Sequence, residues 1–252
     1  MNASEPDILD TFGSISLEEM DSVKLLDRVD TKFAFHCDQL PGILEELRPF
    51  YRILSVNRSR ITRYETCYFD TPDLKFYQQH HNGKLNRWKI RDRRYVGSDQ
   101  CYFEIKFKNN KGRMIKDRIR IKELSGTIDG SSSAFLTKKT PFLPGMLRPV
   151  LTVLYDRITL VGINFDERLT IDTRLSFRAA GEERSFPKVV IAEIKQQKTS
   201  RSPFLSLMHQ HHIRKLAVSK YCLGVASMFR DVKKNNFNIK LRHINNLNHA
   251  HS

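Results

Sequence analysis

Lysine and arginine recur at every second position along several segments that have the composition of β-strands. Alternate residues of a strand point to the same face, so each run gathers its charges on one side of a sheet. In NRWKIRDRR the aligned residues are Arg87, Lys89, Arg91 and Arg93. Arginine presents a planar fork of N–H donors to phosphate oxygens and lysine a compact charge, so such a face is suited to binding a chain of phosphates.

Six further segments carry charged residues in the same alternation. They are RVDTKFAF at 28–35, CYFEIKFK at 101–108, IKDRIRIK at 115–122, VLYDRITL at 153–160, RLTIDTRLSF at 168–177 and VVIAEIKQ at 189–196. In an open sheet these charges would face solvent, which is the usual arrangement of charge on strands. In a closed barrel they would line a wet interior, with helices outside. Closure is favoured if several strands share one ligand, as seven cationic strands suggest.

Helices are expected between the strands. Ser16 and Glu19 form a capping box, and Thr71-Pro72 and Ser202-Pro203 each place a cap before a proline,. Together with apolar spacing, these signals predict helices at about 17–26, 39–48, 72–82, 203–212 and 219–229,. Residues 1–231 are predicted to form a single domain. The segment 232–252 is polar, Asn-rich and basic, and is predicted to be a disordered tail,.

The charge balance indicates a polyanionic partner. The 252 residues include 43 Lys and Arg against 28 Asp and Glu, a formal net charge of +15,. Four cysteines lie far apart without a CxxC pair, so we expect neither a zinc site nor a disulfide framework, and reduced thiols fit the cytoplasm,. The acidic N-terminus is unlike a secretory or transit signal, and no apolar run reaches the roughly 20 residues of a membrane span.

Common phosphate-binding motifs are absent from the sequence. It contains no GxxxxGK[ST] loop, no GxGxxG after a strand and no set of kinase motifs,. Phosphates would therefore be held by side chains rather than by backbone amides at a helix N-terminus. The closely spaced histidines His209, His211 and His212 have no carboxylate or cysteine near them in the sequence, which favours a surface helix over a metal site.

Two glutamates interrupt the cationic faces. Glu104 and Glu193 each stand two residues before a lysine, in the sequence Glu-Ile-Lys. A carboxylate among cations stays ionised, and it could pair with them or hold a divalent ion. Both alternatives remain open on the residues alone. The only tryptophan, Trp88, has the opposite parity to Lys89 and is expected to pack away from the charges.

The order of these motifs resembles a known family. RVDTKF, YETCYFDTPD, KIRDRRY, FEIKFK, KDRIRI, LYDRITL, RLTIDTRLSF, VIAEIK and VSKY resemble the catalytic domain of the vacuolar transporter chaperone (VTC) complex, over about residues 20–228. That domain belongs to the triphosphate tunnel metalloenzymes. The resemblance implies a mainly β, α+β fold: a closed tunnel of eight antiparallel strands with helices packed around the outside. It also implies transfer of the ATP γ-phosphate to a growing inorganic polyphosphate chain, with Mn²⁺ or Mg²⁺.

Site residues follow from the matching motifs and from the strand faces. Catalytic roles are implied for Lys32, Arg91, Arg93, Lys106, Lys116, Arg157 and Lys220. Phosphate binding is expected of Lys89, Arg118, Tyr155, Arg168, Lys195 and Ser219. Glu193 is the leading candidate metal ligand and Glu104 a weaker one. The superfamily strand ExExK resembles Arg28–Lys32 here, which keeps the lysine and lacks both glutamates, and this departure favours the VTC branch over the hydrolase and cyclase branches.

Competing functions use the same charges. A tripolyphosphatase would replace the phosphate acceptor with water, and a non-catalytic polyphosphate-binding module would use Glu193 only as a salt bridge. A nucleic-acid binder ranks last, because exposed aromatic residues are not interleaved with the cations. The expected partners are therefore ATP and inorganic polyphosphate, without specific nucleic acid. The eukaryotic complex also has membrane helices, so a membrane-protein partner in trans is an open alternative, as is the oligomeric state.

Overall fold

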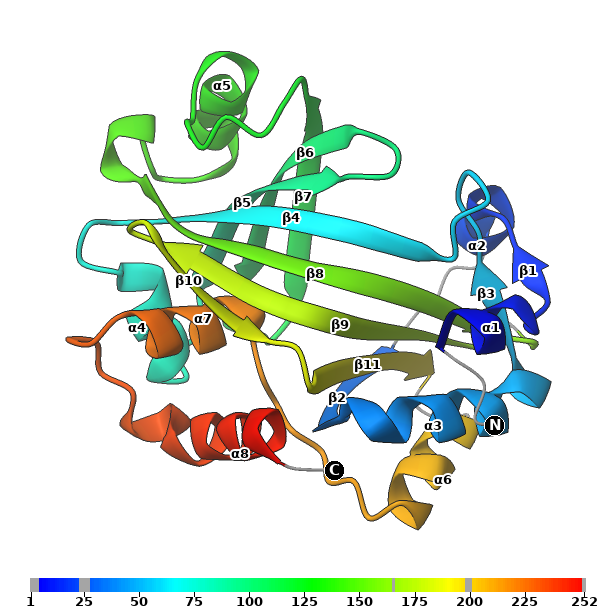
Figure 1. Ribbon diagram of the computed structural model, residues 1–252. Coiled ribbons are helices and arrows are strands. Elements are labelled where there is room, and N and C mark those ends of the chain that lie inside the picture. The colour runs from blue at the N-terminus through cyan, green and yellow to red at the C-terminus, as the bar shows by residue number, and fades with distance from the viewer. Residues whose placement is uncertain (1–4, 23–27, 165, 198–200, 251–252) are drawn as a thin grey trace.

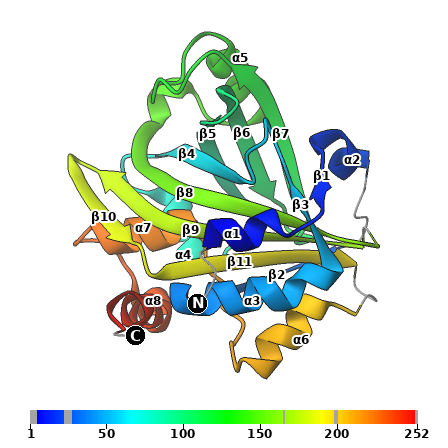
Figure 2. The same ribbon diagram turned by 45° about the vertical axis from the view of Figure 1, so that its right-hand side comes forward.

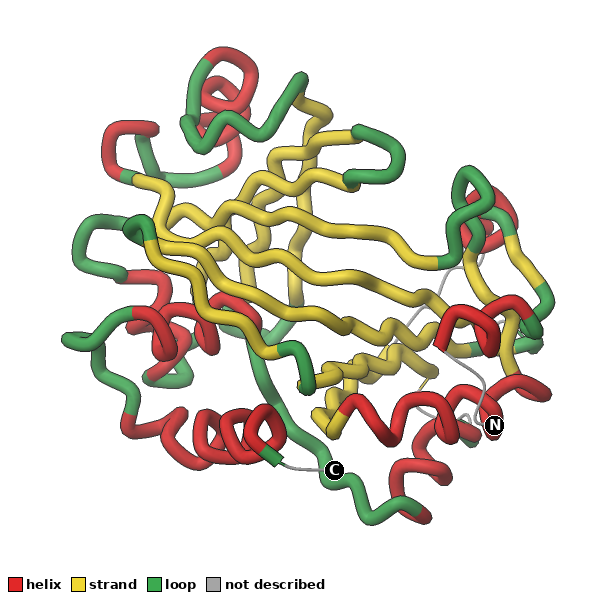
Figure 3. The backbone as a smooth tube through the Cα atoms, viewed as in Figure 1, coloured by secondary structure: helices red, strands yellow, loops and turns green. Residues whose placement is uncertain are grey.

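The computed structural model of the chain describes residues 5–22, 28–164, 166–197 and 201–250. Its centre is one mainly antiparallel sheet whose strands follow a curved surface (Figure 1, Figure 3). Eight strands are joined in the order β2-β11-β9-β8-β4-β5-β6-β7. Their bounds are β2 Arg28–His36, β4 Ile61–Asp70, β5 Arg87–Tyr95, β6 Gln100–Lys108, β7 Met114–Ile121, β8 Arg148–Gly162, β9 Glu167–Ala179 and β11 Val189–Gln197. Three shorter strands extend the sheet: β1 Ser14–Ile15, β3 Tyr51–Leu54 and β10 Glu182–Phe186.

The sheet does not close into a barrel. In the described residues, β2 and β7 are the two end strands of this path, and no ladder joins them. One edge of β2 pairs with β11, and the other is occupied by the segment after α6 (Pro203–Gln210). There Phe33 bridges Lys215, and the Leu216 amide donates to the Lys32 carbonyl at 2.8 Å. That edge is therefore partly occupied at Lys32 and Phe33, and β7 does not pair with it. The prediction of a closed eight-stranded barrel is wrong in its closure, although a path of eight strands is present.

Helices α1 (Glu5–Asp10), α3 (Leu40–Leu47) and α6 pack on one face of β2, β11, β9 and β8 (Figure 1, Figure 2). We call this the outer face. Phe33 and Phe35, which alternate with Lys32 along β2, join its buried apolar cluster and contribute with Ile171 of β9 to the core. The edge-to-face contact of Phe33 with Phe204 of α6, with ring centroids 5.5 Å apart, anchors that helix,.

The outer face of β4, β5 and β6 is covered by other elements. Phe76 of α4 (Lys75–His81) and Leu136 of α5 (Gly130–Lys139) pack there with Cys67, Ile90 and Phe103. α5 lies beside β7 and β6 at the upper end of the molecule in Figure 1. The cationic strands β5 and β6 therefore bury their apolar side chains outward, as the alternation predicts.

Part of the opposite face is apolar and is covered by α7 (Lys220–Met228). Val153 and Phe177 of the sheet pack there with Tyr221 and Val225 of the helix. Gly224 allows this close approach, because a Cβ at this position would lie 2.7 Å from Cδ1 of Phe177 and closer still to Cδ2 of Leu151. The rest of this face carries the charged residues described below.

The segment after residue 231, predicted to be disordered, contains helix α8 (Asn238–His249). Ile244 is fully buried in the cluster under α7, and Leu241 and Leu247 pack against the same cluster. These three apolar residues recur at helical spacing in an otherwise polar segment. The expectation of a disordered tail is therefore wrong for residues 238–249, and composition alone concealed the apolar stripe.

The local helix signals are partly confirmed. The Ser16 amide donates to Oε2 of Glu19 at 2.8 Å and the Glu19 amide to Oγ of Ser16 at 3.2 Å, which is the predicted capping box before α2 (Leu17–Ser22). The predicted extension of this helix to residue 26 lies outside the described residues. The described residues also contain four 3₁₀ helices: η1 Cys37–Gln39, η2 Arg48–Phe50, η3 Pro144–Met146 and η4 Asn235–Phe237. Among the described helices, none combines the length and the apolar composition needed to cross a bilayer.

Candidate functional site

The register of the strands brings the predicted cations onto one face. Residues directly opposite each other in a ladder lie on the same side of the sheet. Across β5, β6 and β7, Arg91 stands opposite Glu104, which stands opposite Arg118. Two residues further along these strands, Lys89 stands opposite Lys106, which stands opposite Lys116. Three neighbouring strands thus place their charges side by side.

The other half of the sheet continues this arrangement. Lys32 of β2 stands opposite Glu193 of β11, and Lys195 of β11 stands opposite Arg168 of β9. On β8, Arg157 stands opposite Asp172 of β9. We call this the basic face. Its strand members among the predicted site residues are Lys32, Lys89, Arg91, Arg93, Glu104, Lys106, Lys116, Arg118, Tyr155, Arg157, Arg168, Glu193 and Lys195.

Arg91 and Glu104 form a buried pair at the centre of β5 and β6. Nε of Arg91 donates to Oε2 of Glu104 at 2.6 Å, Nη2 contacts the same oxygen, and Nη1 donates to the hydroxyl of Tyr68 at 2.9 Å. Burial alone would raise the pKa of Glu104, but Arg91, Arg93 and Lys106 outweigh it and hold this pKa well below its ordinary value,. Glu104 is therefore ionised and fixes the orientation of the Arg91 guanidinium.

Glu193 lies between two lysines. Its Oε2 is 3.3 Å from Nζ of Lys32, and Nζ of Lys195 donates to its Oε1. Burial would raise the pKa of Glu193, but Lys195 and Lys32 outweigh it, so that the pKa lies well below its ordinary value,. The Glu193 side chain remains one-fifth exposed, more than twice as much as that of Glu104.

A third carboxylate, Asp172, belongs to this face although sequence reasoning gave it no role. It is 1% exposed and lies between Arg157 and Lys220. Burial would raise the pKa of Asp172, but these two cations hold it below its ordinary value,. The alternation of RLTIDTRLSF places Asp172 on the cationic side. The proximity of Lys220, which comes from a distant helix, has no signal in the sequence.

Tyrosine rings lie under the arginines of β5 and β8. Cζ of Arg93 is 5.1 Å and Cζ of Arg157 is 5.0 Å from the centroid of the Tyr64 ring. Tyr64 stacks on Tyr155 with centroids 5.0 Å apart and planes 13° apart. Burial raises the pKa of Tyr64 to about 12, so the phenol is neutral near physiological pH,. Tyr64 is a second residue of the site that the sequence did not single out.

Helix α7 brings the two remaining predicted residues to the basic face. Ser219 precedes α7, and its Oγ accepts a hydrogen bond from Nζ of Lys89 at 3.0 Å. Nζ of Lys220 lies 4.6 Å from the centroid of the Tyr155 ring. The pairing of Leu216 with Lys32 fixes the segment that leads to this helix. Residues from β5, β8 and α7, far apart in the chain, thus meet at one place.

Two groups of predicted residues lie at the margins. Lys116 and Arg118 are exposed on the end strand β7, with Arg118 over the ring of Tyr102 at 4.6 Å. Arg168 donates from Nη2 to the carbonyl of Met20 at 3.1 Å, so part of its hydrogen-bonding capacity serves the N-terminal segment. Arg91 and Arg93 lie at the other extreme, 7% and 8% exposed.

A metal ion could be held at only some of the carboxylates. Mg²⁺ and Mn²⁺ prefer oxygen ligands, and Mg²⁺ often takes one or two carboxylates together with substrate phosphates. Glu193 fits this mode, because it is ionised, partly exposed and on the basic face. Glu104 fits the salt-bridge alternative better, because Arg91 contacts its Oε2 through both Nε and Nη2 and the side chain is buried.

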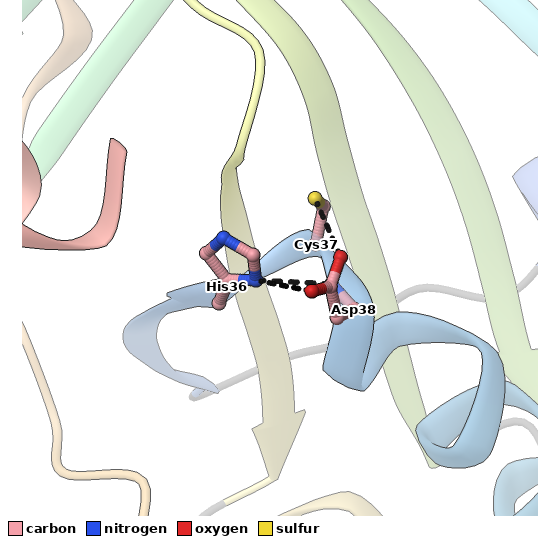
Figure 4. Close-up of side chains that lie close together, drawn as sticks. All are labelled: His36, Cys37 and Asp38. Atoms are coloured by element: carbon pink, nitrogen blue, oxygen red, sulfur yellow. Dashed lines mark hydrogen bonds and ion pairs between the residues drawn. The ribbon is translucent and has the colours of Figure 1, made fainter. Parts of the chain in front are cut away.

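A different cluster, His36, Cys37 and Asp38, brings potential ligand atoms within 4.8 Å of one another (Figure 4). Nδ1 of His36 accepts a hydrogen bond from the Asp38 amide at 3.3 Å, and Sγ of Cys37 donates to Oδ1 of Asp38 at 3.4 Å. The His36 contact caps the N-terminus of η1. Helix capping therefore accounts for the orientation of the His36 ring without a metal ion.

The sequence profile of the VTC domain matches residues 27–229. The chain belongs to the VTC domain family. This confirms the resemblance drawn from the motifs. A search among curated protein sequences finds no match to this VTC domain protein.

Solved structures of other proteins are similar to this VTC domain. A candidate adenylyl cyclase from Hippeastrum with a dominant triphosphatase activity is 12% identical, with a TM-score of 0.50, and the match covers 81% of this chain and 98% of that one. Candidate adenylate cyclases from Bacillus halodurans and Vibrio parahaemolyticus are each 13% identical, with TM-scores of 0.47 and 0.46. Their matches cover 81% and 78% of this chain and 100% and 96% of theirs. At this identity the Hippeastrum likeness shows a shared fold.

Proposed function

We propose that this VTC domain is a polyphosphate polymerase, which transfers the γ-phosphate of ATP to a growing inorganic polyphosphate chain on the basic face. The observation that carries the proposal is the register of the sheet. It aligns cations from β2, β5, β6, β7, β8, β9 and β11 on one side, with Lys220 added from α7. A single flexible polyanion can contact so many separate cations at once.

Phosphoryl transfer needs charge neutralised on the transferred oxygens and the reacting groups held in line. Arg91 and Arg93 are suited to this, because both are almost fully buried and their interaction with a phosphate is less screened than in water,. Lys32 and Lys106 are more exposed and would approach the chain as point charges,. A divalent ion bound at Glu193 would supply Lewis-acid stabilisation of phosphate oxygens.

Three carboxylates of the basic face favour a phosphate acceptor over water. Glu104, Glu193 and Asp172 are each paired with cations that lower their pKa, which makes them poor general bases,. A terminal phosphate of an existing chain is already anionic near neutral pH and needs no such base. Water, the acceptor in a hydrolase, would have to lose a proton to a base or be activated by a bound divalent ion. This difference supports polymer formation over hydrolysis.

Hydrolysis of tripolyphosphate is the second candidate, because the Hippeastrum protein of the same fold is described as having a dominant triphosphatase activity. The two reactions are separated by their products. The purified protein is incubated with ATP and Mn²⁺ or Mg²⁺, and acid-labile polymer is sized by gel electrophoresis. Polymer from ATP supports the proposal, whereas orthophosphate from tripolyphosphate without polymer supports the hydrolase. Tight polyphosphate binding without either product would identify a non-catalytic binding module.

A further inference from the structure

Asp172 is a carboxylate of the basic face that links strand β8 to helix α7. Its Oδ1 accepts a hydrogen bond from Nε of Arg157 at 2.6 Å, and its Oδ2 accepts one from Nη2 of Arg157 at 2.8 Å. Nζ of Lys220 donates to the same Oδ2. Arg157 belongs to β8 and Lys220 is the first residue of α7. Two candidate phosphate ligands from different elements therefore share one buried anion.

The aromatic contacts of these cations do not fix their direction. Cζ of Arg157 lies 5.2 Å and Nζ of Lys220 lies 4.6 Å from the centroid of the Tyr155 ring. A ring attracts a cation to its face but leaves a guanidinium free to turn in its own plane. Two parallel hydrogen bonds to one carboxylate remove that freedom. Asp172 thus determines where the remaining N–H donors of Arg157 point.

Neither stability nor anion attraction accounts for a carboxylate at this position. A buried ion pair often stabilises a protein no more than apolar residues of the same volume would. A negative charge on the basic face also opposes the approach of a polyanion. The contribution that assists phosphate chemistry is orientation. We infer that Asp172 is a positioning residue that directs Arg157 and Lys220 toward the bound phosphate chain, an inference that rests on the proposed function.

The variant Asp172→Asn separates orientation from charge. Asparagine keeps the size but cannot accept all three hydrogen bonds, so we expect kcat to fall about tenfold or more as the donors lose alignment. The Kd for tripolyphosphate should stay the same or become tighter, because the basic face gains one unit of positive charge. Unchanged kcat with tighter binding would mean that Asp172 acts only through charge, and would overturn the inference.

Asp156→Asn is the matched control. Asp156 is also a buried aspartate with two cationic partners, Arg63 and Arg174, and its neighbour Arg157 points to the other side of the sheet. We expect this variant to retain the wild-type kcat and Kd in its folded fraction. Equal losses of kcat in both variants, in proportion to a fall in thermal stability, would show a structural role for Asp172 and count against positioning.

A double-mutant cycle tests the inference without turnover. Calorimetry gives the Kd of tripolyphosphate for the wild type, Asp172→Asn, Arg157→Gln and the double variant. If Asp172 orients Arg157, then Arg157→Gln should weaken binding about threefold less in the Asp172→Asn background than in the wild type. Additive effects, or a larger loss in that background, would overturn positioning. If the wild type binds tripolyphosphate but forms no product, the polymerase proposal is refuted, and the cycle still tests the positioning role of Asp172. If the wild type does not bind tripolyphosphate at all, both the polymerase proposal and the positioning role are refuted.

Discussion

Asp92 of β5 lies directly opposite Cys67 of β4 on the outer face. Cys67 belongs to the apolar cluster that α5 covers. The Asp92 side chain is 1% exposed, and neither of its oxygens has a hydrogen-bond partner among the described residues. Burial, with a smaller effect of Asp129, raises its pKa from 3.8 to about 7,. A carboxylate is thus buried on the strand that carries Arg91 and Arg93, facing away from them.

This carboxylate should make stability depend on pH. The unfolded chain releases the Asp92 proton near pH 3.8 and the folded chain near pH 7, so folding is progressively penalised as pH rises between these values,. The full penalty above pH 7 is on the order of 4 kcal/mol. In urea denaturation, the free energy of unfolding of Asp92→Asn should rise relative to that of the wild type from pH 5 to pH 7, and the difference should stay constant above pH 7. Asp99→Asn, at an exposed site, is the control, and parallel pH curves for Asp92→Asn and wild type would contradict the prediction.

Adjacent arginines on opposite faces of β5 offer a test of the basic face. Arg93 lies on that face near Thr66, whereas Arg94 lies on the outer face and pairs with Asp99 at 3.0 Å. Arg93→Ala should lower polymer formation about 100-fold or more, because a buried charge that we propose contacts the phosphates is lost. Arg94→Ala should change it less than about twofold, in line with the small effect of exposed ion pairs. Comparable losses in the two variants would show that total charge matters and not the face.

Glu193→Gln should uncouple phosphate binding from the divalent ion. The substitution removes a negative charge between Lys32 and Lys195, so tripolyphosphate should bind at least as tightly as to wild type when no metal is present,. The additional affinity that Mg²⁺ or Mn²⁺ gives the wild type should disappear, because the candidate ligand is gone. Calorimetry with and without metal measures both effects. If Mg²⁺ or Mn²⁺ still increases the affinity of Glu193→Gln for tripolyphosphate, the ion is bound by other residues.

Two helical glycines should respond in opposite ways to alanine. At Gly224 a Cβ would collide with Leu151 and Phe177, so Gly224→Ala should destabilise the fold by about 1–3 kcal/mol and displace Lys220 and Ser219 with α7,. At Gly42 of α3 nothing lies within 4 Å, and Gly42→Ala should stabilise the helix by about 0.5–1 kcal/mol,. Thermal unfolding measures the two changes. A neutral Gly224→Ala would mean that α7 can move without cost.

The sequence predicted what alternation and capping can encode. The charged parity of β5 and β6, the outward packing of Trp88 on Phe107 and the Ser16–Glu19 box are all confirmed, because each depends on residues close in the chain or on one strand. The closure of the sheet into a barrel was mispredicted because it depends on which segment lies on the edge of β2 that does not pair with β11. Leu216 does so through a backbone hydrogen bond, which leaves no side-chain pattern.

The features of the site and fold that the sequence did not predict share a physical cause. Asp172 and Lys220 are 48 residues apart and meet only because α7 packs on the sheet. Tyr64 is under Arg93 and Arg157 because β4 lies between β5 and β8, an order that does not follow the chain. α8 was missed because Asn-rich composition outweighed the spacing of Leu241, Ile244 and Leu247. Each depends on tertiary packing, which local periodicity does not report.

The unjoined edges of β2 and β7 bear on how a polymer reaches the cations. In a seamless cylinder, a long substrate has to be fed in by one end. Here, across the described part of the sheet, no backbone hydrogen bond between these strands has to break for the two edges to separate. A polyanion that approached the cations from this side would meet the segment at Lys215 and Leu216, which is bonded to the edge of β2, and not a continuous β-ladder.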